Sequence, residues 1–273
     1  MGLKTLMGDY PVTKAFKSHT SKFDFAEVKG SPASAFKRVV RNLEFDVAEL
    51  AIITFLLAKA HGKPYRLLPA VIMARFQHPY LVYNAERGVM SPRDLPGKRV
   101  GQRSYSVTTA TWLRGILAQD HGVELGRIRW VTFEEPHVEE FKDPPNVERA
   151  PEGKNITDML LSGELDAAIL GEIPKDERLK PVIADPQAAA MQWKEKYGAG
   201  VQINHMVVVK SDVDRRTADE VYSLLKESKK AAGNPETNPF GIEENRRNLE
   251  VAIDCVYRQK MIPRRFTVEE LFQ

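Results

Sequence analysis

Short apolar segments typical of strands alternate with helical segments along most of the chain, and this alternation limits the fold more than any other feature. Strands are expected over residues 3–7, 23–28, 65–73, 79–83, 129–133, 165–170 and 201–210. Between them, apolar residues recur at helical spacing, as in the segments 36–43 and 188–197. Such alternation is typical of α/β domains with mainly parallel sheets.

The 273 residues of the chain are enough for two moderate domains. Residues 85–92 are polar and contain Gly and Pro, as expected of a connection between lobes. We therefore predict one discontinuous lobe of residues 1–90 plus 201–273, and a second lobe of residues 91–200. Two such lobes would enclose a cleft, and open α/β sheets bind ligands beyond the carboxyl ends of their strands.

A turn, strand, polar loop and helix starting at Leu95 form the segment richest in hydroxyl side chains. The polar residues at the expected helix start are Arg103, Ser104, Tyr105, Ser106, Thr108 and Thr109. A helix start leaves N–H groups unpaired and carries the positive end of the helix dipole, so it binds anions. One hydroxyl there would serve as an ordinary helix cap. The four Ser and Thr hydroxyls, next to Tyr105 and Arg103, favour a pocket for a carboxylate or a phosphate.

Two acidic residues, Asp46 and Glu49, are expected in the first turn of the helix that carries Leu50 and Ile53. Acidic residues in a first turn complement the helix dipole, which is one interpretation. The other places one of the two carboxylates in a ligand cleft. The residues themselves leave both open.

A basic pair, Arg75 and His78, lies between two apolar strand-like segments. Buried polar groups need partners, because an unpaired one costs several kcal/mol. A single His beside a strand is usually structural, whereas the Arg-x-x-His spacing at a strand junction indicates a site. Another histidine, His205, lies at the apolar start of a later strand.

Composition and missing motifs exclude several function classes. The net charge of +3 is too small to indicate binding to nucleic acid or to a membrane. GxGxxG, Walker A, HExxH, CxxC and GxSxG motifs are absent, so a dinucleotide cofactor, a zinc site and a hydrolase triad are unsupported. The single Cys255 suits helix packing. The first ten residues lack the features of a secretory signal, so we expect a cytoplasmic protein.

Motifs spread over nearly the whole chain carry a resemblance to a known family. They are Gly8-Asp9-Tyr10, Phe45–Leu50, Arg75–His78, Gly97–Gly101, Thr108 to Ala110, Trp112, Arg114 to Ile116, Arg129–Val131, Pro151–Lys154, Gly163–Ala167, His205, Pro239–Arg246 and Val268–Phe272. Together they resemble the 4,5-dihydroxyphthalate decarboxylase family, which is similar in fold to type 2 periplasmic solute-binding proteins. The resemblance implies two α/β lobes with a ligand cleft between them. It also implies conversion of 4,5-dihydroxyphthalate to 3,4-dihydroxybenzoate and carbon dioxide.

This reaction suggests roles for the candidate residues. His78 is expected to protonate the ring carbon that bears the departing carboxylate. Glu49, Asp46 or His205 would act as the base on the phenol. The remaining carboxylate would be held, and the ring contacted, by Arg75, Ser104, Tyr105, Thr108 and Thr109. The reaction requires no organic cofactor, and a divalent metal is left open.

Two other functions fit the same resemblance. One is a solute-binding protein for a small aromatic carboxylate, without catalysis. The other is a different lyase on the same scaffold, as in menaquinone-pathway enzymes. In each case the expected partner is a small aromatic carboxylate, with no nucleic acid and no membrane, and the oligomeric state is left open.

Overall fold

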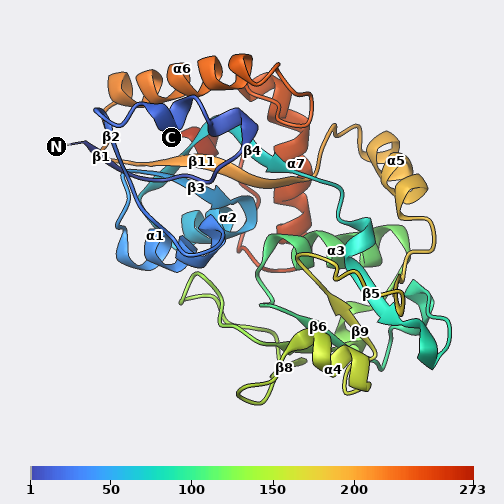
Figure 1. Cartoon of the computed structure of the whole chain (residues 1–273). Helices are drawn as coiled ribbons and strands as arrows, with labels where there is room; N and C mark the ends of the chain where they lie inside the picture. Colours follow the sequence, from blue (N-terminus) through green and yellow to red (C-terminus); the bar gives the residue numbers. More distant parts are fainter. Residues whose placement is uncertain (1) are drawn as a thin grey trace. The chain divides into compact units, whose positions relative to one another are not determined.

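The chain forms two compact units in the computed structural model, which describes residues 2–273 (Figure 1). The first unit contains the chain up to Arg75 and Ala199–Gln273, and the second contains Phe76–Gly198. The predicted first boundary at residue 90 is therefore too late. Its error has a simple cause: strand β5 (Leu81–Asn84) pairs with strands of the second unit.

The first unit has a five-stranded sheet in the order β2-β1-β3-β11-β4. Its strands are β1 (Leu3–Leu6), β2 (Phe23–Phe25), β3 (Val47–Ala51), β4 (Tyr65–Ala74) and β11 (Ile203–Lys210). Its helices are α1 (Phe36–Asn42), α2 (Ile52–Ala60), α6 (Arg215–Ala231) and α7 (Ile242–Arg258). Strand β1 is parallel to β2 and β3, whereas β11 is antiparallel to β3 and β4.

Apolar packing on both faces holds this sheet in place. Figure 1 shows α6 on one side of the strands and α1 and α2 on the other. Buried residues of α6, including Val221 and Leu225, join one core cluster with Val47, Val207 and Val209 of the central strands. Burying an aliphatic side chain of this size stabilises a fold by about 1.5–3 kcal/mol.

The second unit has a six-stranded sheet in the order β10-β5-β9-β6-β7-β8. Its remaining strands are β6 (Arg99–Gln102), β7 (Arg129–Thr132), β8 (Val147–Arg149), β9 (Ala167–Ile169) and β10 (Leu179–Pro181). Its helices are α3 (Thr108–Asp120), α4 (Ile156–Ser162) and α5 (Pro186–Tyr197). Strands β9, β6, β7 and β8 are parallel, and β5 runs antiparallel to β9.

The predicted α/β class is confirmed, but each sheet is mixed rather than purely parallel. In each unit the strand that follows a crossing between units, β5 or β11, enters the sheet antiparallel to its neighbours. No helix among the described residues is both long enough and apolar enough to cross a membrane.

Local structure differs from prediction around the two acidic residues. Strand β3 continues to Ala51, so Glu49 lies inside a strand and Asp46 precedes it. Helix α2 begins only at Ile52. All five residues of β3 are buried between neighbouring strands, and sheet pairing on both sides keeps the backbone extended.

Candidate functional site

The first unit contains a hydrogen-bonded cluster around Glu49, which is fully buried. The hydroxyl of Tyr10 donates to Glu49 Oε1 at 2.8 Å, and the backbone N–H of Gly8 donates to Oε2 at 2.9 Å. Nδ1 of His205 lies 2.5 Å from Oε1. We call Gly8, Tyr10, Glu49 and His205 the Glu49 cluster.

The sheet register explains why these residues meet. Glu49 of β3 pairs with Val207 of β11, and Ala51 pairs with His205. Glu49 and His205 are therefore diagonal neighbours on one face of an antiparallel pair, within reach of long side chains. Gly8 follows the carboxyl end of β1, which is parallel to β3. The cluster thus lies at the carboxyl ends of two parallel strands, where α/β sheets bind ligands.

The surroundings of the cluster favour proton transfer at one atom. A buried carboxylate is stabilised by its hydrogen-bond donors, because it has lost its hydration. Burial and the neighbouring Glu49 carboxylate raise the pKa of the Tyr10 phenol far above its usual range, so Tyr10 remains a neutral donor. The side chain of His205 is 13% exposed, and its ring meets the Phe36 ring edge-on at 5.2 Å. Because Nδ1 faces Glu49, Nε2 is the ring nitrogen left to exchange a proton with a ligand.

The second unit contains a polar cluster at the start of α3. The helix begins after Val107, which has no side-chain hydrogen bond to cap it. Neighbouring Ser104 and Thr108 are buried, and Ser104 Oγ and Thr108 Oγ1 have no hydrogen-bond partner within residues 2–273. Uncapped N–H groups beside unpaired hydroxyls form an environment suited to an oxyanion.

A buried guanidinium lies behind this helix start. Arg114 of α3 is fully buried and donates to Gln102 Oε1 at 2.8 Å and to Thr111 Oγ1 at 3.2 Å. Its central carbon lies 3.7 Å from the centre of the Tyr105 ring, a cation–π contact. We call Gln102, Ser104, Tyr105, Thr108 and Arg114 the Thr108 cluster.

The predicted site residues are only partly brought together. Glu49 and His205 meet, and Ser104, Tyr105 and Thr108 gather at the start of α3, where half-buried Thr109 also lies. The Tyr105 ring, however, contacts Arg114 and stacks on Phe141 at 6.4 Å, so it packs inside the unit.

Asp46 contacts other partners than the Glu49 cluster. Asp46 accepts the backbone N–H of Lys4 at 2.9 Å, and its carboxylate lies 3.8 Å from Lys210 Nζ. It therefore fixes the end of the sheet where β1 and β3 begin. Arg75 follows β4, and its backbone N–H donates to the carbonyl of Gln202.

His78 lies in neither cluster. It occupies a short 3-10 turn, His78–Tyr80, that packs against α3 and α5 within the second unit. Burial lowers its pKa to about 4, with smaller effects from the charges of Asp120 and His121 at the carboxyl end of α3. The Thr108 cluster lies at the opposite end of that helix. The role of His78 as the ring-protonating acid stays a prediction.

Four residues in these clusters, Gly8, Tyr10, Gln102 and Arg114, were not among the candidate site residues. Tyr10 follows the first strand, and the order of strands in the sheet was needed to place it beside Glu49. Gln102 ends a strand, and Arg114 lies inside a helix, where an arginine usually faces solvent. For Gln102 and Arg114, the signal in the sequence was the short distance between a strand end and a helix start.

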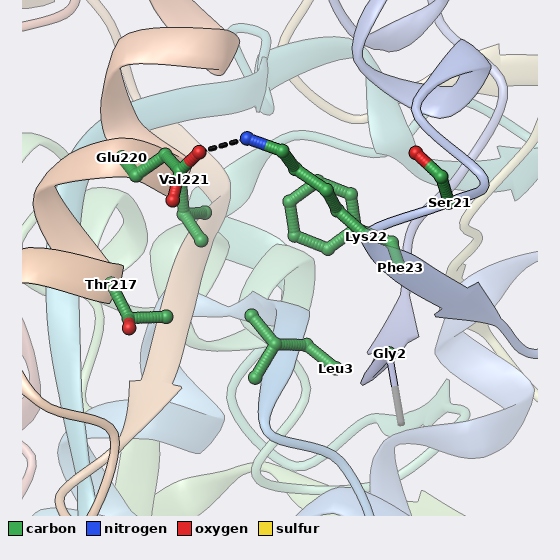
Figure 2. Close-up of a pocket in the computed structure, with 8 residues that line it drawn as sticks. All are labelled: Gly2, Leu3, Ser21, Lys22, Phe23, Thr217, Glu220 and Val221. Atoms are coloured by element: carbon green, nitrogen blue, oxygen red, sulfur yellow. Dashed lines mark hydrogen bonds and ion pairs between the residues drawn. The ribbon is translucent and has the colours of Figure 1, made fainter.

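Two cavities of the first unit lie away from the Glu49 cluster. One of about 220 Å³ is bounded by the amino ends of β1 and β2 and by α6, and Figure 2 shows Lys22 reaching across it to Glu220. A more open one, of about 670 Å³, lies beside His61 and Tyr257. No group of three or more His, Cys, Asp or Glu within residues 2–273 is arranged to hold a metal ion.

Comparison with known proteins gives two close relatives. The chain is 34% identical over 178 residues to a 4,5-dihydroxyphthalate decarboxylase from Comamonas testosteroni and 34% identical over 175 residues to one from Pseudomonas putida. The matches cover 60% and 59% of this chain, and 54% and 68% of the two relatives. The match thus spans about half the length of the Comamonas protein. No protein-family model matches the chain.

Solved structures with the same fold include binding proteins. The aliphatic sulphonate-binding protein SsuA from Escherichia coli matches with a TM-score of 0.55 and 12% identity, over 100% of this chain and 92% of its own. SsuA from Xanthomonas axonopodis pv. citri matches with a TM-score of 0.53 and 14% identity, over 98% and 96%. These likenesses show the two-lobe fold of periplasmic binding proteins. With 34% identity over 68% of the Pseudomonas putida relative, the chain belongs to the 4,5-dihydroxyphthalate decarboxylase family.

Proposed function

We propose that the chain is an aromatic-acid decarboxylase that converts 4,5-dihydroxyphthalate to 3,4-dihydroxybenzoate and carbon dioxide. The observation that carries the proposal is the buried pair of Glu49 and His205, whose Oε1 and Nδ1 atoms are 2.5 Å apart. A carboxylate that orients an imidazole is a recurrent arrangement for moving protons. The names of the two relatives support the substrate.

The reaction requires a proton on the ring carbon that bears the departing carboxylate. The hydroxyl para to that carbon loses its proton, and its electrons enter the ring. The ring carbon forms a bond to hydrogen, and its bond to the carboxyl carbon then breaks. The electron pair of that broken bond returns to the ring and restores aromaticity. Carbon dioxide leaves, the phenol regains a proton, and one hydrogen has replaced one carboxylate. The enzyme must therefore donate and accept protons in a fixed geometry.

The Glu49 cluster suits this task. His205 would deliver the proton from Nε2, while Glu49 holds Nδ1 and stabilises the imidazolium that carries it. Tyr10 and the Gly8 N–H hold the carboxylate in place through its two oxygens. This assigns to His205 the proton-donating role first expected of His78.

The Thr108 cluster of the second unit is suited to bind a carboxylate. Its uncapped helix start and the unpaired hydroxyls of Ser104 and Thr108 would donate hydrogen bonds to the carboxylate oxygens. The cluster would then recognise a carboxylate through hydrogen bonds to its oxygens.

Turnover by purified protein of defined metal content tests the proposal. We expect steady release of carbon dioxide and 3,4-dihydroxybenzoate from 4,5-dihydroxyphthalate over many turnovers. Tight binding without product would contradict catalysis and favour a solute-binding protein. Turnover of a different aromatic carboxylate alone would overturn the substrate and favour another lyase on this scaffold.

A further inference from the structure

The most informative contact outside the proton-transfer residues joins two buried side chains of the second unit. Arg114 donates to Gln102 Oε1 at 2.8 Å, and both side chains are fully buried. A guanidinium has only donors, so the oxygen of the amide must face it, and the NH₂ group must point elsewhere. Arg114 therefore fixes the orientation of the Gln102 amide.

The fixed amide leaves a donor without a partner. Gln102 Nε2 is buried and makes no hydrogen bond within residues 2–273. The same is true of Ser104 Oγ and Thr108 Oγ1. Hydroxyls can turn to donate or accept, but this NH₂ group can only donate. Leaving a buried donor unpaired is costly, and most such groups in native proteins have a partner.

The placement of Gln102 explains what the partner would be. Gln102 is the last residue of β6, the strand that leads into the loop of Ser104 and the start of α3. Val107 leaves that helix start without a side-chain cap. Helix N–H groups, an NH₂ group and two hydroxyls that can donate together form a set of donors, which matches an acceptor-only group such as a carboxylate.

We propose that Gln102 is a carboxylate-binding residue and that Arg114 is the positioning residue that orients it. This inference rests on the proposed function for the identity of the substrate, and it names residues of the site beyond those the reaction itself suggests. The contact of Arg114 with the Tyr105 ring at 3.7 Å holds the guanidinium from a second side. Arg114 acts only through Gln102 in this role.

The variant Gln102→Glu tests the donor. It keeps an oxygen toward Arg114, where an ion pair replaces the hydrogen bond from the guanidinium to a neutral amide. It also replaces the NH₂ group with a second oxygen. A purely structural Gln102 would tolerate this change. A carboxylate-binding Gln102 would not, since two carboxylate oxygens would face each other. The matched control is Gln119→Glu, the same change near the other end of α3.

Isothermal titration calorimetry with phthalate and 4,5-dihydroxyphthalate provides the measurement. We expect Q102E to lose at least 100-fold in affinity, Q119E to bind as wild type, and the thermal midpoint of Q102E to stay at or above that of wild type. Equal affinity of Q102E and wild type would overturn the inference. Wild-type binding without turnover would overturn the proposed function alone, and no wild-type binding of either compound would overturn both.

A second measurement covers loss of fold in Q102E and tests Arg114. In a ¹⁵N–¹H spectrum of the wild-type chain, the side-chain amide signals of Gln102, assigned by labelling glutamine, should shift when phthalate is added. In R114M they should broaden or move to the position of a freely rotating amide, and R114K should restore affinity only in part. Unchanged Gln102 signals on ligand addition would contradict the proposal.

Discussion

Glu49 and His205 are 156 positions apart in the chain, yet Oε1 of one lies 2.5 Å from Nδ1 of the other. The register of β3 and β11 places them on one face of the sheet. The sheet register, and not proximity in the sequence, therefore brings the pair together. Because its proposed role is proton transfer, its removal should lower kcat more than substrate affinity.

Replacing His205 tests the proton donor. In H205N the side-chain amide can still donate to Glu49, so the fold should survive, but no atom can deliver a proton in place of Nε2. We expect kcat to fall about 10²–10⁴-fold with KM within a few-fold of wild type. The control is H19N, at a half-exposed histidine of the same unit. A kcat close to the wild-type value in H205N would exclude His205 as the donor.

Removing the Tyr10 hydroxyl should destabilise the first unit. Y10F leaves Glu49 Oε1 with one donor fewer, and hydrogen bonds to charged groups contribute about 1.5–3 kcal/mol. Urea unfolding of Y10F should show a loss of this size. The control is Y222F, at a half-buried tyrosine of α6 that stacks on Phe240. Equal losses of unfolding free energy in Y10F and Y222F would mean that the hydrogen bond from Tyr10 to Glu49 adds no stability of its own.

A methyl group at Gly8 should disturb the same carboxylate. A Cβ there would lie 2.5 Å from Tyr10 Cε2 and 2.9 Å from Glu49 Oε2, closer than ordinary contact. Overpacking of this kind costs about 1–3 kcal/mol, and displacement of Glu49 should lower kcat of G8A at least tenfold. G126A is the control, because its Cβ would meet nothing within 4 Å. Full activity of G8A would show that the Glu49 cluster can shift to accept the methyl group without loss of catalysis.

The hydroxyl of Thr108 should contribute to substrate affinity. T108V keeps the shape of the side chain and removes the unpaired Oγ1, so we expect KM to rise about 3–10-fold with little change in kcat. The matched change T157V alters a threonine near the start of α4. If T108V and T157V gave the same KM, Thr108 would not contact the substrate.

Folding stability should fall in mild acid because of His78. Burial lowers its pKa from 6.5 to about 4, so the unfolded chain binds the proton more readily between these values. The contribution is fully present above pH 6.5 and is lost as the pH falls toward 4. The loss over this window is about 3 kcal/mol, since each pH unit contributes about 1.4 kcal/mol.

Urea unfolding of wild type and H78Q at pH 7 and pH 4.5 measures this effect. The stability of wild type should fall more than that of H78Q between the two pH values. The same fall in both proteins would mean that other groups determine the acid sensitivity of the fold.

The sequence was sufficient for the features that depend on local pattern. Helical periodicity and the hydroxyl-rich loop located the start of α3 at Thr108, and strand-like segments located β1, β4 and β7. The position of Glu49 was misjudged because a buried central strand leading directly into a helix has no polar boundary in its sequence.

Features that depend on sheet order were beyond reach of local pattern. Nothing in the spacing of Glu49 and His205 shows that β11 lies next to β3, and nothing near His78 shows that its turn packs against α3 and α5. The predicted first boundary failed for a related reason. Pairing of β5 with β9 and β10, rather than its distance along the chain, decides which unit contains it.

The insertion of β11 between β3 and β4 has a consequence for synthesis on the ribosome. The second unit is one continuous segment, so all of its sheet has been made when Gly198 emerges. The first unit begins earlier but lacks an inner strand until residues 203–210 follow. A nascent chain should therefore complete the sheet of its second unit before that of its first. The contact of Glu49 with His205 can form only in the last quarter of translation.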